Sequence, residues 1–275
     1  MLGTLVGDIN GSIYQYNNGP KTKKFKLFTE DMYFTDDSLI TLAVAEVLNR
    51  HTPFTYSKEN LKELKRDLVK TFVRYVKRYS DLEYGAMFYD WAFGKNNYRP
   101  YNSLGNGAPM RISPVGWVSN SIEEVKLLSY IVTSVTHNHP DSYDASEAVA
   151  MCIYLSRIGK SKEDIKKYVV THYYPELEDL KYKELVETYD FDVTSKGTAP
   201  VAIYAFLISN SFEDCLRTAI SIGGDTDTLA AISMSIAEAY YYKKEDLQYY
   251  KKKVRRYLDN DLYTTFNSFT SRFIR

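Results

Sequence analysis

The chain has 275 residues, and its 35 basic and 35 acidic side chains leave a formal net charge of zero. This length suits one large domain or two small ones. The balanced charge argues against a general nucleic-acid-binding surface, which normally shows an excess of basic residues. We find no secretory signal, and no uncharged apolar run approaches the ~20 residues that a membrane-spanning helix needs. We therefore expect a soluble, cytoplasmic protein without a membrane partner, and we expect it to be a monomer.

Helical spacing dominates the chain. Between residues 57 and 79, apolar side chains recur at intervals of three and four residues, and Ser57 precedes them as an N-cap candidate. The same spacing continues over 121–135, where Ser121 and Glu124 form a capping pattern. Both segments are therefore predicted to be helices with one buried face.

Further helix-start and helix-end patterns predict additional helices. Ser-x-x-Asp patterns at 161–164 and 211–214 predict two more helix starts, and Gly159 is typical of a helix end. Strand alternation is scarce, and no βαβ rhythm or fixed repeat occurs. The sequence predicts one compact all-α domain over residues 1–275, with roughly ten or more helices. Additional helices are expected over 37–49, 144–158, 198–209, 226–241 and 245–258.

The chain has only two cysteines, Cys152 and Cys215. Each lies inside an apolar stretch with helical spacing, and neither shows metal-ligand spacing. We therefore expect both to be small buried residues in a reducing compartment.

Two acidic clusters, far apart in the chain, each lead directly into an apolar helical stretch. The first holds Asp36 and Asp37, and the second holds Asp225 and Asp227 beside Thr228. Helix capping explains one acid at one helix start. Capping does not require two acids and a hydroxyl at two separate places, and paired carboxylates are costly to desolvate without a neutralising charge.

Divalent cations would supply that charge. Four aspartates balance two such ions, and ligation by oxygen atoms alone favours Mg²⁺, Mn²⁺ or Ca²⁺ over zinc. The four histidines do not suggest a zinc constellation. We therefore expect the two clusters to meet at a metal site.

Two long segments, 95–120 and 186–197, lack a clear helical period, and such loops are often functional. Within the first, two glycines flank Asn106. The exposed backbone there can cradle phosphate or sugar oxygens, although a turn-rich connector explains the same pattern. The pair His137 and His139 more often indicates a helix cap than a ligand contact.

Five motifs occur in one order along the chain: GDINGS (7–12), FTDDSLITLAVAEVL (34–48), GNGAPMRISPVGW (105–117), THNHPD (136–141) and GGDTDTLAAISMSIAEAYY (223–241). In this order they resemble the ADP-ribosylglycohydrolase family, which includes the dinitrogenase-reductase-activating glycohydrolase and the ADP-ribosyl-acceptor hydrolases. The resemblance runs from residue 3 to about residue 241.

The resemblance implies an all-α fold whose cleft holds two Mg²⁺ ions, with Mn²⁺ as the alternative, and an activity that releases ADP-ribose from a modified protein side chain, nucleobase or small molecule. The implied metal ligands are Thr35, Asp36, Asp37, Asp225, Asp227 and Thr228. The implied contacts to ADP-ribose are Asp36, Ser103, Leu104, Gly105, Asn106, Gly107, Ala108 and His137.

One departure from the family pattern concerns catalysis. Gln15 stands where many members carry a glutamate, and an amide cannot exchange a proton as a carboxylate does. The implied catalytic positions are thus Gln15, Asp36 and Asp37, with one of the two aspartates as a possible base. A smaller departure is Pro109, directly after the glycine loop (residues 103–108), which removes one backbone N–H at the end of that loop.

The departure at position 15 leaves several alternatives open. The chain is an active hydrolase with another base, a naturally weakened member that binds ADP-ribose without efficient turnover, or a glutamate-to-glutamine variant made to trap a ligand. A purely structural role is a further alternative, which the intact acidic clusters disfavour.

Overall fold

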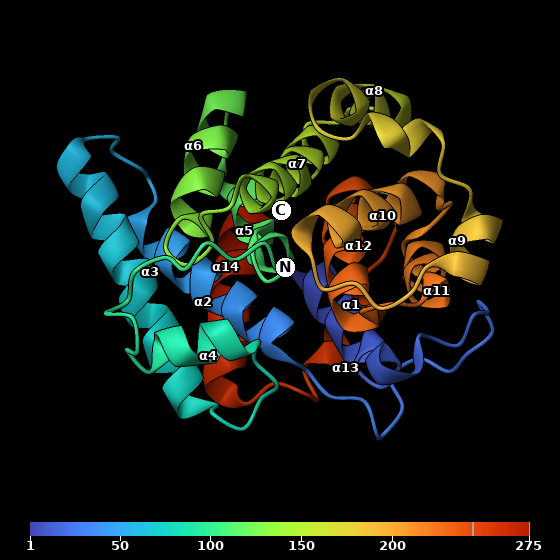
Figure 1. The fold of residues 1–275 in the computed structure, drawn as a ribbon, viewed down its shortest axis with the longest axis horizontal. Helices are drawn as coiled ribbons and strands as arrows, with labels where there is room; N and C mark the ends of the chain where they lie inside the picture. The colour runs from blue at the N-terminus through green and yellow to red at the C-terminus, as the bar shows by residue number, and fades with distance from the viewer. Residues whose placement is uncertain (244, 275) are drawn as a thin grey trace.

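The computed structural model describes residues 1–243 and 245–274 (Figure 1). These residues form fourteen α-helices and three short 3₁₀ helices, and this described part contains no β-strand, which confirms the predicted all-α class. The α-helices are α1 (Leu2–Gly11), α2 (Asp36–His51), α3 (Lys58–Arg78), α4 (Ala86–Ala92), α5 (Ser113–Val118), α6 (Ile122–Thr133), α7 (Pro140–Arg157), α8 (Lys162–His172), α9 (Tyr182–Thr188), α10 (Ser195–Ile208), α11 (Phe212–Ile222), α12 (Thr226–Tyr241), α13 (Gln248–Val254) and α14 (Asn260–Phe273). The 3₁₀ helices are η1 (Gln15–Asn17), η2 (Pro109–Arg111) and η3 (Pro175–Glu178).

Two helices from opposite ends of the chain, α1 and α12, pack against each other near the centre of the molecule (Figure 1). Gly7 and Gly11 of α1 face α12 across a direct backbone contact. A Cβ atom added to Gly7 would lie 2.3 Å from the carbonyl oxygen of Ala230, and one added to Gly11 would lie 2.5 Å from Cα of Asp227. Because only glycine fits, the contact brings Asp8 of α1 close to the start of α12.

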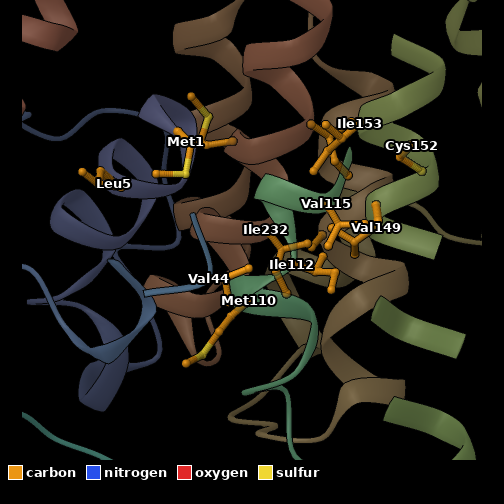
Figure 2. Close-up of a cluster of buried hydrophobic side chains, with 14 of the residues drawn as sticks. Met1, Leu5, Val44, Met110, Ile112, Val115, Val149, Cys152, Ile153 and Ile232 are labelled. Carbon is orange, nitrogen blue, oxygen red and sulfur yellow. The ribbon is translucent and has the colours of Figure 1, made fainter. Parts of the chain in front are cut away.

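The remaining helices surround this pair. Helices α2, α3 and α14 lie on one side of it in Figure 1, and α9, α10 and α11 lie on the other. The buried apolar side chains form one cluster, part of which is shown in Figure 2. There Ile112 and Val115 meet Val149 and Ile153 of α7, and Ile232 of α12 lies alongside.

The capping predictions are confirmed. Each of the four predicted serines accepts a hydrogen bond from the backbone N–H three residues later. Gly159 follows the end of α7 with a φ of +85°. The four N-caps are Ser57, Ser121, Ser161 and Ser211.

Other elements differ from the prediction. The segment 95–120, which shows no helical period in the sequence, contains η2 and α5. Helix α5 was not predicted because it is short and buried on every side, and so shows no amphipathic period. Helix α1 was missed for the same reason, since all of its residues are buried. The prediction over 245–258 is too long, because α13 covers only Gln248–Val254, and the separate helix α14 was missed.

Two predictions from composition can be compared directly with the structure. Cys152 and Cys215 are both buried and unpaired, as expected. Among the described residues, no helix is long and apolar enough to span a membrane.

Candidate functional site

The starts of α2 and α12 open into one cavity of about 600 Å³. Residues of the first acidic cluster and residues of the second line it together, so the two clusters meet as predicted. The glycine loop and His137 also contribute to its wall. The lining includes these residues predicted from sequence: Gln15, Thr35, Asp36, Asp37, Ser103, Leu104, Gly105, Asn106, Gly107, His137, Asp225, Asp227 and Thr228.

A buried carboxylate from α1 fixes the start of α2. The hydroxyl of Thr35, the N-cap of α2, accepts a hydrogen bond from the backbone N–H of Asp37 (3.3 Å) and donates one to Asp8 Oδ1 (2.8 Å). Asp8 Oδ2 also accepts the backbone N–H groups of Thr35 (3.0 Å) and Ser38 (3.1 Å). Asp8 is not among the site residues predicted from the sequence, although an acid inside an apolar segment is a signal that could have indicated it.

The second cluster is held by a turn and by an amide side chain. Gly223 and Gly224 adopt positive φ values of +91° and +73°, which direct the chain into α12. Asn106 Nδ2 donates a hydrogen bond to Asp225 Oδ2 at 2.7 Å. The hydroxyl of Thr228 donates one to Asp37 Oδ2 at 3.1 Å, which joins the two clusters directly.

The cluster can hold a metal ion. Carboxylate oxygens of Asp8, Asp37 and Asp227 lie within 4.8 Å of one another. The Oδ1 atoms of Asp37 and Asp227 are buried and accept no hydrogen bond from the described residues. Such unpartnered oxygens are costly, and a divalent cation bound by them would remove that cost.

Burial raises the pKa of every aspartate in this cluster, and repulsion between neighbouring carboxylates adds to it for Asp36, Asp37 and Asp227. Burial raises the pKa of Asp8 to about 6, and burial reinforced by Asp8 and Asp225 raises that of Asp36 to about 8. For the same two reasons the pKa of Asp37 and of Asp227 lies well above the usual range. The site therefore favours bound protons or bound cations over free carboxylates.

The two irregular segments predicted to be functional form one wall of the cavity. The backbone N–H of Asn106 donates to Val193 O (2.8 Å), and that of Ser195 donates to Leu104 O (2.7 Å). This connection holds the glycine loop, residues 103–108, against the start of α10. Ala108 is the exception among the predicted contacts, because it is fully buried and does not line the cavity.

His137 lies behind the glycine loop. Its Nδ1 is 2.8 Å from Thr136 Oγ1, and a Cβ atom added to Gly107 would lie 3.5 Å from its Nε2. Burial, together with the nearby guanidinium of Arg111, holds the pKa of His137 well below its usual range. The imidazole is therefore neutral at pH 7 and can use Nε2 toward the loop.

Gln15 also lines the cavity, and it contacts a carboxylate, Glu83, that is not among the predicted site residues. Its Nε2 donates to Ser12 O and to Glu83 Oε2, both at 3.3 Å. The hydroxyl of Tyr16 donates to the same Glu83 oxygen at 2.7 Å. Glu83 precedes α4 in a segment without a recognisable motif, so only the fold reveals this contact.

A sequence model of the ADP-ribosylglycohydrolase family matches residues 1–260. The chain belongs to the ADP-ribosylglycohydrolase family. This confirms the resemblance inferred from the five motifs. The matched span ends at residue 260, so the assignment of residues 1–275 to a single domain of this family stays a prediction.

Individual relatives of this ADP-ribosylglycohydrolase have low sequence identity to it, and in two of them the similarity extends over most of the chain. The ADP-ribosylhydrolase ARH3 of Mus musculus is 25% identical, with 88% of this chain and 82% of that protein covered. The Homo sapiens ARH3 is 22% identical, with 95% and 90% covered. The ADP-ribosylarginine hydrolase Tri1 of Pseudomonas putida is 26% identical over 54% of this chain and 41% of its own length.

A solved structure agrees with the family's fold. It is described as an ADP-ribosylglycohydrolase-related protein complex, and it superposes with a TM-score of 0.70 at 21% identity. The superposition covers 99% of this chain and 96% of that chain. The all-α architecture of this ADP-ribosylglycohydrolase is therefore shared along nearly its whole length, and its curated relatives are enzymes that act on ADP-ribose linkages.

Proposed function

We propose that this chain is a divalent-cation-dependent hydrolase that cleaves the glycosidic bond between ADP-ribose and a modified acceptor. The observation that carries the proposal is the hydrogen bond from Thr228 to Asp37, which brings two acidic helix starts to one cavity. The names of the relatives support the choice of ADP-ribose as substrate. The acceptor is a protein side chain, a nucleobase or a small molecule.

The metal would be two Mg²⁺ ions, with Mn²⁺ as the alternative, because every candidate ligand is an oxygen atom. The buried, unpartnered Oδ1 atoms of Asp37 and Asp227 support this assignment. Asp8 would support the site indirectly, because its hydrogen bonds hold the proposed ligand Thr35 in place. When bound, the cations would neutralise the cluster and orient sugar hydroxyls. The proposed ligands are Thr35, Asp36, Asp37, Asp225, Asp227 and Thr228.

The remaining wall of the cavity would bind ADP-ribose. Its volume of about 600 Å³ lies within the range of roughly 300–1,000 Å³ typical of small-molecule sites. The glycine loop would present backbone N–H groups to phosphate oxygens, as such loops do elsewhere. His137, neutral and buried, would offer Nε2 as a hydrogen-bonding atom beside that loop. The proposed contacts are Asp36, residues 103–107 and His137; nothing in the geometry adds support for Ala108.

Hydrolysis at the anomeric carbon passes through an oxocarbenium-like state, which needs a positioned water and a carboxylate near the bond that breaks. The cavity is lined by carboxylates and by the glycine loop, which meet where Asn106 donates a hydrogen bond to Asp225. Substrate bound along the loop would thus present its distal ribose to the acidic cluster.

The test is release of ADP-ribose from defined substrates. Peptides carrying ADP-ribosyl-arginine or ADP-ribosyl-serine are incubated with the purified chain and Mg²⁺, and the products are followed by mass spectrometry. We expect release that stops in excess EDTA and in the variant Asp225→Ala. Full turnover in EDTA would contradict the metal dependence.

A second candidate function is an ADP-ribose-binding protein without efficient turnover. It is favoured by one observation, the amide of Gln15 in the cavity lining. Calorimetry that shows binding of ADP-ribose with Mg²⁺, together with no release from the full substrate panel, would select this function. We also propose that the chain is a monomer in the cytoplasm, where unpaired cysteines stay reduced.

A further inference from the structure

The cavity is lined by five carboxylates, and one of them stands apart. Four belong to the aspartate cluster at the starts of α2 and α12, whereas Glu83 comes from the segment between α3 and α4. Cations bound by the cluster would engage the aspartate oxygens. Glu83 would then be the carboxylate of the lining that remains available to exchange a proton.

The hydrogen bonds to Glu83 position its carboxylate through one oxygen atom and leave the other oxygen without a donor from the described residues. Oε2 accepts hydrogen bonds from Tyr16 (2.7 Å) and Gln15 (3.3 Å), and Oε1 accepts none from the described part of the chain. The following residue, Tyr84, anchors the segment through a hydrogen bond from its hydroxyl to Tyr79 O (2.8 Å). Glu83 is exposed to solvent at this point, so water can reach the free oxygen.

We propose that Glu83 is the catalytic carboxylate of this enzyme and that it supplies the proton transfer that the amide of Gln15 cannot. This inference rests on the proposed hydrolase function. Gln15 then has a positioning role, because its Nε2 donates a hydrogen bond to Glu83. A carboxylate that exchanges protons in glycoside hydrolysis need not follow a fixed sequence position, provided that it lies beside the bond that breaks.

The reaction balances as a simple hydrolysis. The bond between the anomeric carbon and the acceptor atom breaks, and its electron pair leaves on the acceptor atom. A water oxygen forms the new bond to the anomeric carbon, and one proton of that water passes to Glu83. Glu83 returns a proton to the acceptor, so one water is consumed and ADP-ribose and free acceptor are formed.

Other proton acceptors in or near the cavity are less suited to this role. His137 has its Nδ1 engaged with Thr136 and lies behind the glycine loop. Asp8 is fully buried, does not line the cavity, and accepts hydrogen bonds from the start of α2. Asp36 and Asp37 belong to the proposed metal ligands. Glu83 combines access to water with a free oxygen.

The test compares three variants of the full-length chain with Mg²⁺ and an ADP-ribosylated peptide. Glu83→Gln keeps the shape of the side chain, and we expect kcat to fall about 100-fold or more, within the usual range for loss of a general acid–base group. KM, the affinity for ADP-ribose and the melting temperature should stay unchanged. The control is Asp90→Asn, on α4, whose partner is Lys95 outside the cavity lining.

The third variant exchanges the two groups. Gln15→Glu combined with Glu83→Gln keeps one carboxylate and one amide in contact, and we expect it to regain at least a tenth of the wild-type kcat. Because a glutamate at position 15 can act by itself, the result that separates a catalytic from a structural role of Glu83 is Glu83→Gln alone, in which kcat falls while KM and the melting temperature stay unchanged. If Glu83→Gln retains the wild-type kcat, or changes only KM, the inference is wrong and the hydrolase function stands. If the wild-type chain releases no ADP-ribose, both fail.

Discussion

Thr228 on α12 donates a hydrogen bond to Asp37 on α2 at 3.1 Å. This single contact joins two helix starts that are separated by most of the chain. Beside it, Asp37 Oδ1 and Asp227 Oδ1 are buried without a partner among the described residues. The contact therefore lies within a set of buried carboxylate oxygens that a bound cation would stabilise.

The Thr228 contact can be tested with isosteric side chains. Thr228→Val removes the hydroxyl while keeping the volume, and we expect Mg²⁺ affinity, measured by calorimetry, to fall about tenfold or more, because a buried carboxylate loses its donor and the site loses a ligand. Thr228→Ser keeps the hydroxyl and serves as the matched control. Equal Mg²⁺ affinity in both variants would exclude Thr228 as a ligand.

Asn106 links the glycine loop to the metal cluster. Its side-chain amide donates to Asp225 Oδ2 (2.7 Å) and to Thr198 Oγ1 (3.2 Å). Because the first of these bonds lowers the pKa of Asp225, we expect Asn106→Ala to raise that pKa and weaken Mg²⁺ binding at pH 6 more than at pH 8. Calorimetry at the two pH values measures the difference, and a pH-independent loss would argue against this linkage.

The packing of α1 on α12 predicts a large effect of one methyl group. A Cβ atom at position 7 would lie 2.3 Å from the carbonyl oxygen of Ala230. We therefore expect Gly7→Ala to lower the free energy of unfolding by about 1–3 kcal/mol, the usual cost of overpacking. Denaturation by urea measures the change.

Gly85 offers the matched control for this substitution. Its φ is −56°, and an added Cβ atom would meet nothing within 4 Å. Gly85→Ala should change the free energy of unfolding by less than about 1 kcal/mol, because alanine restricts the unfolded chain but is a poorer N-cap of α4 than glycine. A similar loss of stability in both variants would contradict the backbone contact as the cause.

The aspartate cluster predicts how stability depends on pH. In the metal-free protein, the folded-state pKa values of Asp8 and Asp36 are about 6 and about 8, above the ordinary value of 3.8. The folded state therefore holds these protons more tightly than the unfolded state does. Their contribution to stability is fully present below pH 4 or so and is lost as the pH rises through 6 and then 8.

Added Mg²⁺ should reverse this trend, since it competes with protons for the same oxygens. We expect the gain in melting temperature on adding Mg²⁺ to be small at pH 5 and large at pH 8. Recording the difference between EDTA and Mg²⁺ at each pH removes the contribution of groups outside the cluster. A gain that does not change with pH would show that these carboxylates are not the binding groups.

The sequence alone determined the elements that depend on local chemistry. Each serine N-cap satisfies an N–H group of its own helix, and the helices with an apolar face have a period that the sequence displays. The acidic clusters were also recognisable, because paired carboxylates before an apolar helix need an explanation beyond capping. Local patterns could not show α1 or α5, since helices buried on every side have no polar face to mark their period.

Which distant residues share the site depends on how the helices pack. Asp8 reaches the start of α2 through hydrogen bonds from Thr35 and Ser38, while glycines of the same helix let α1 touch the backbone of α12. Glu83 reaches Gln15 through a turn between helices that carries no motif. Neither contact has a local sequence signature, because each depends on packing between segments far apart in the chain. The sequence therefore indicated the cation-binding chemistry, and the fold brought Glu83 into the same cavity lining.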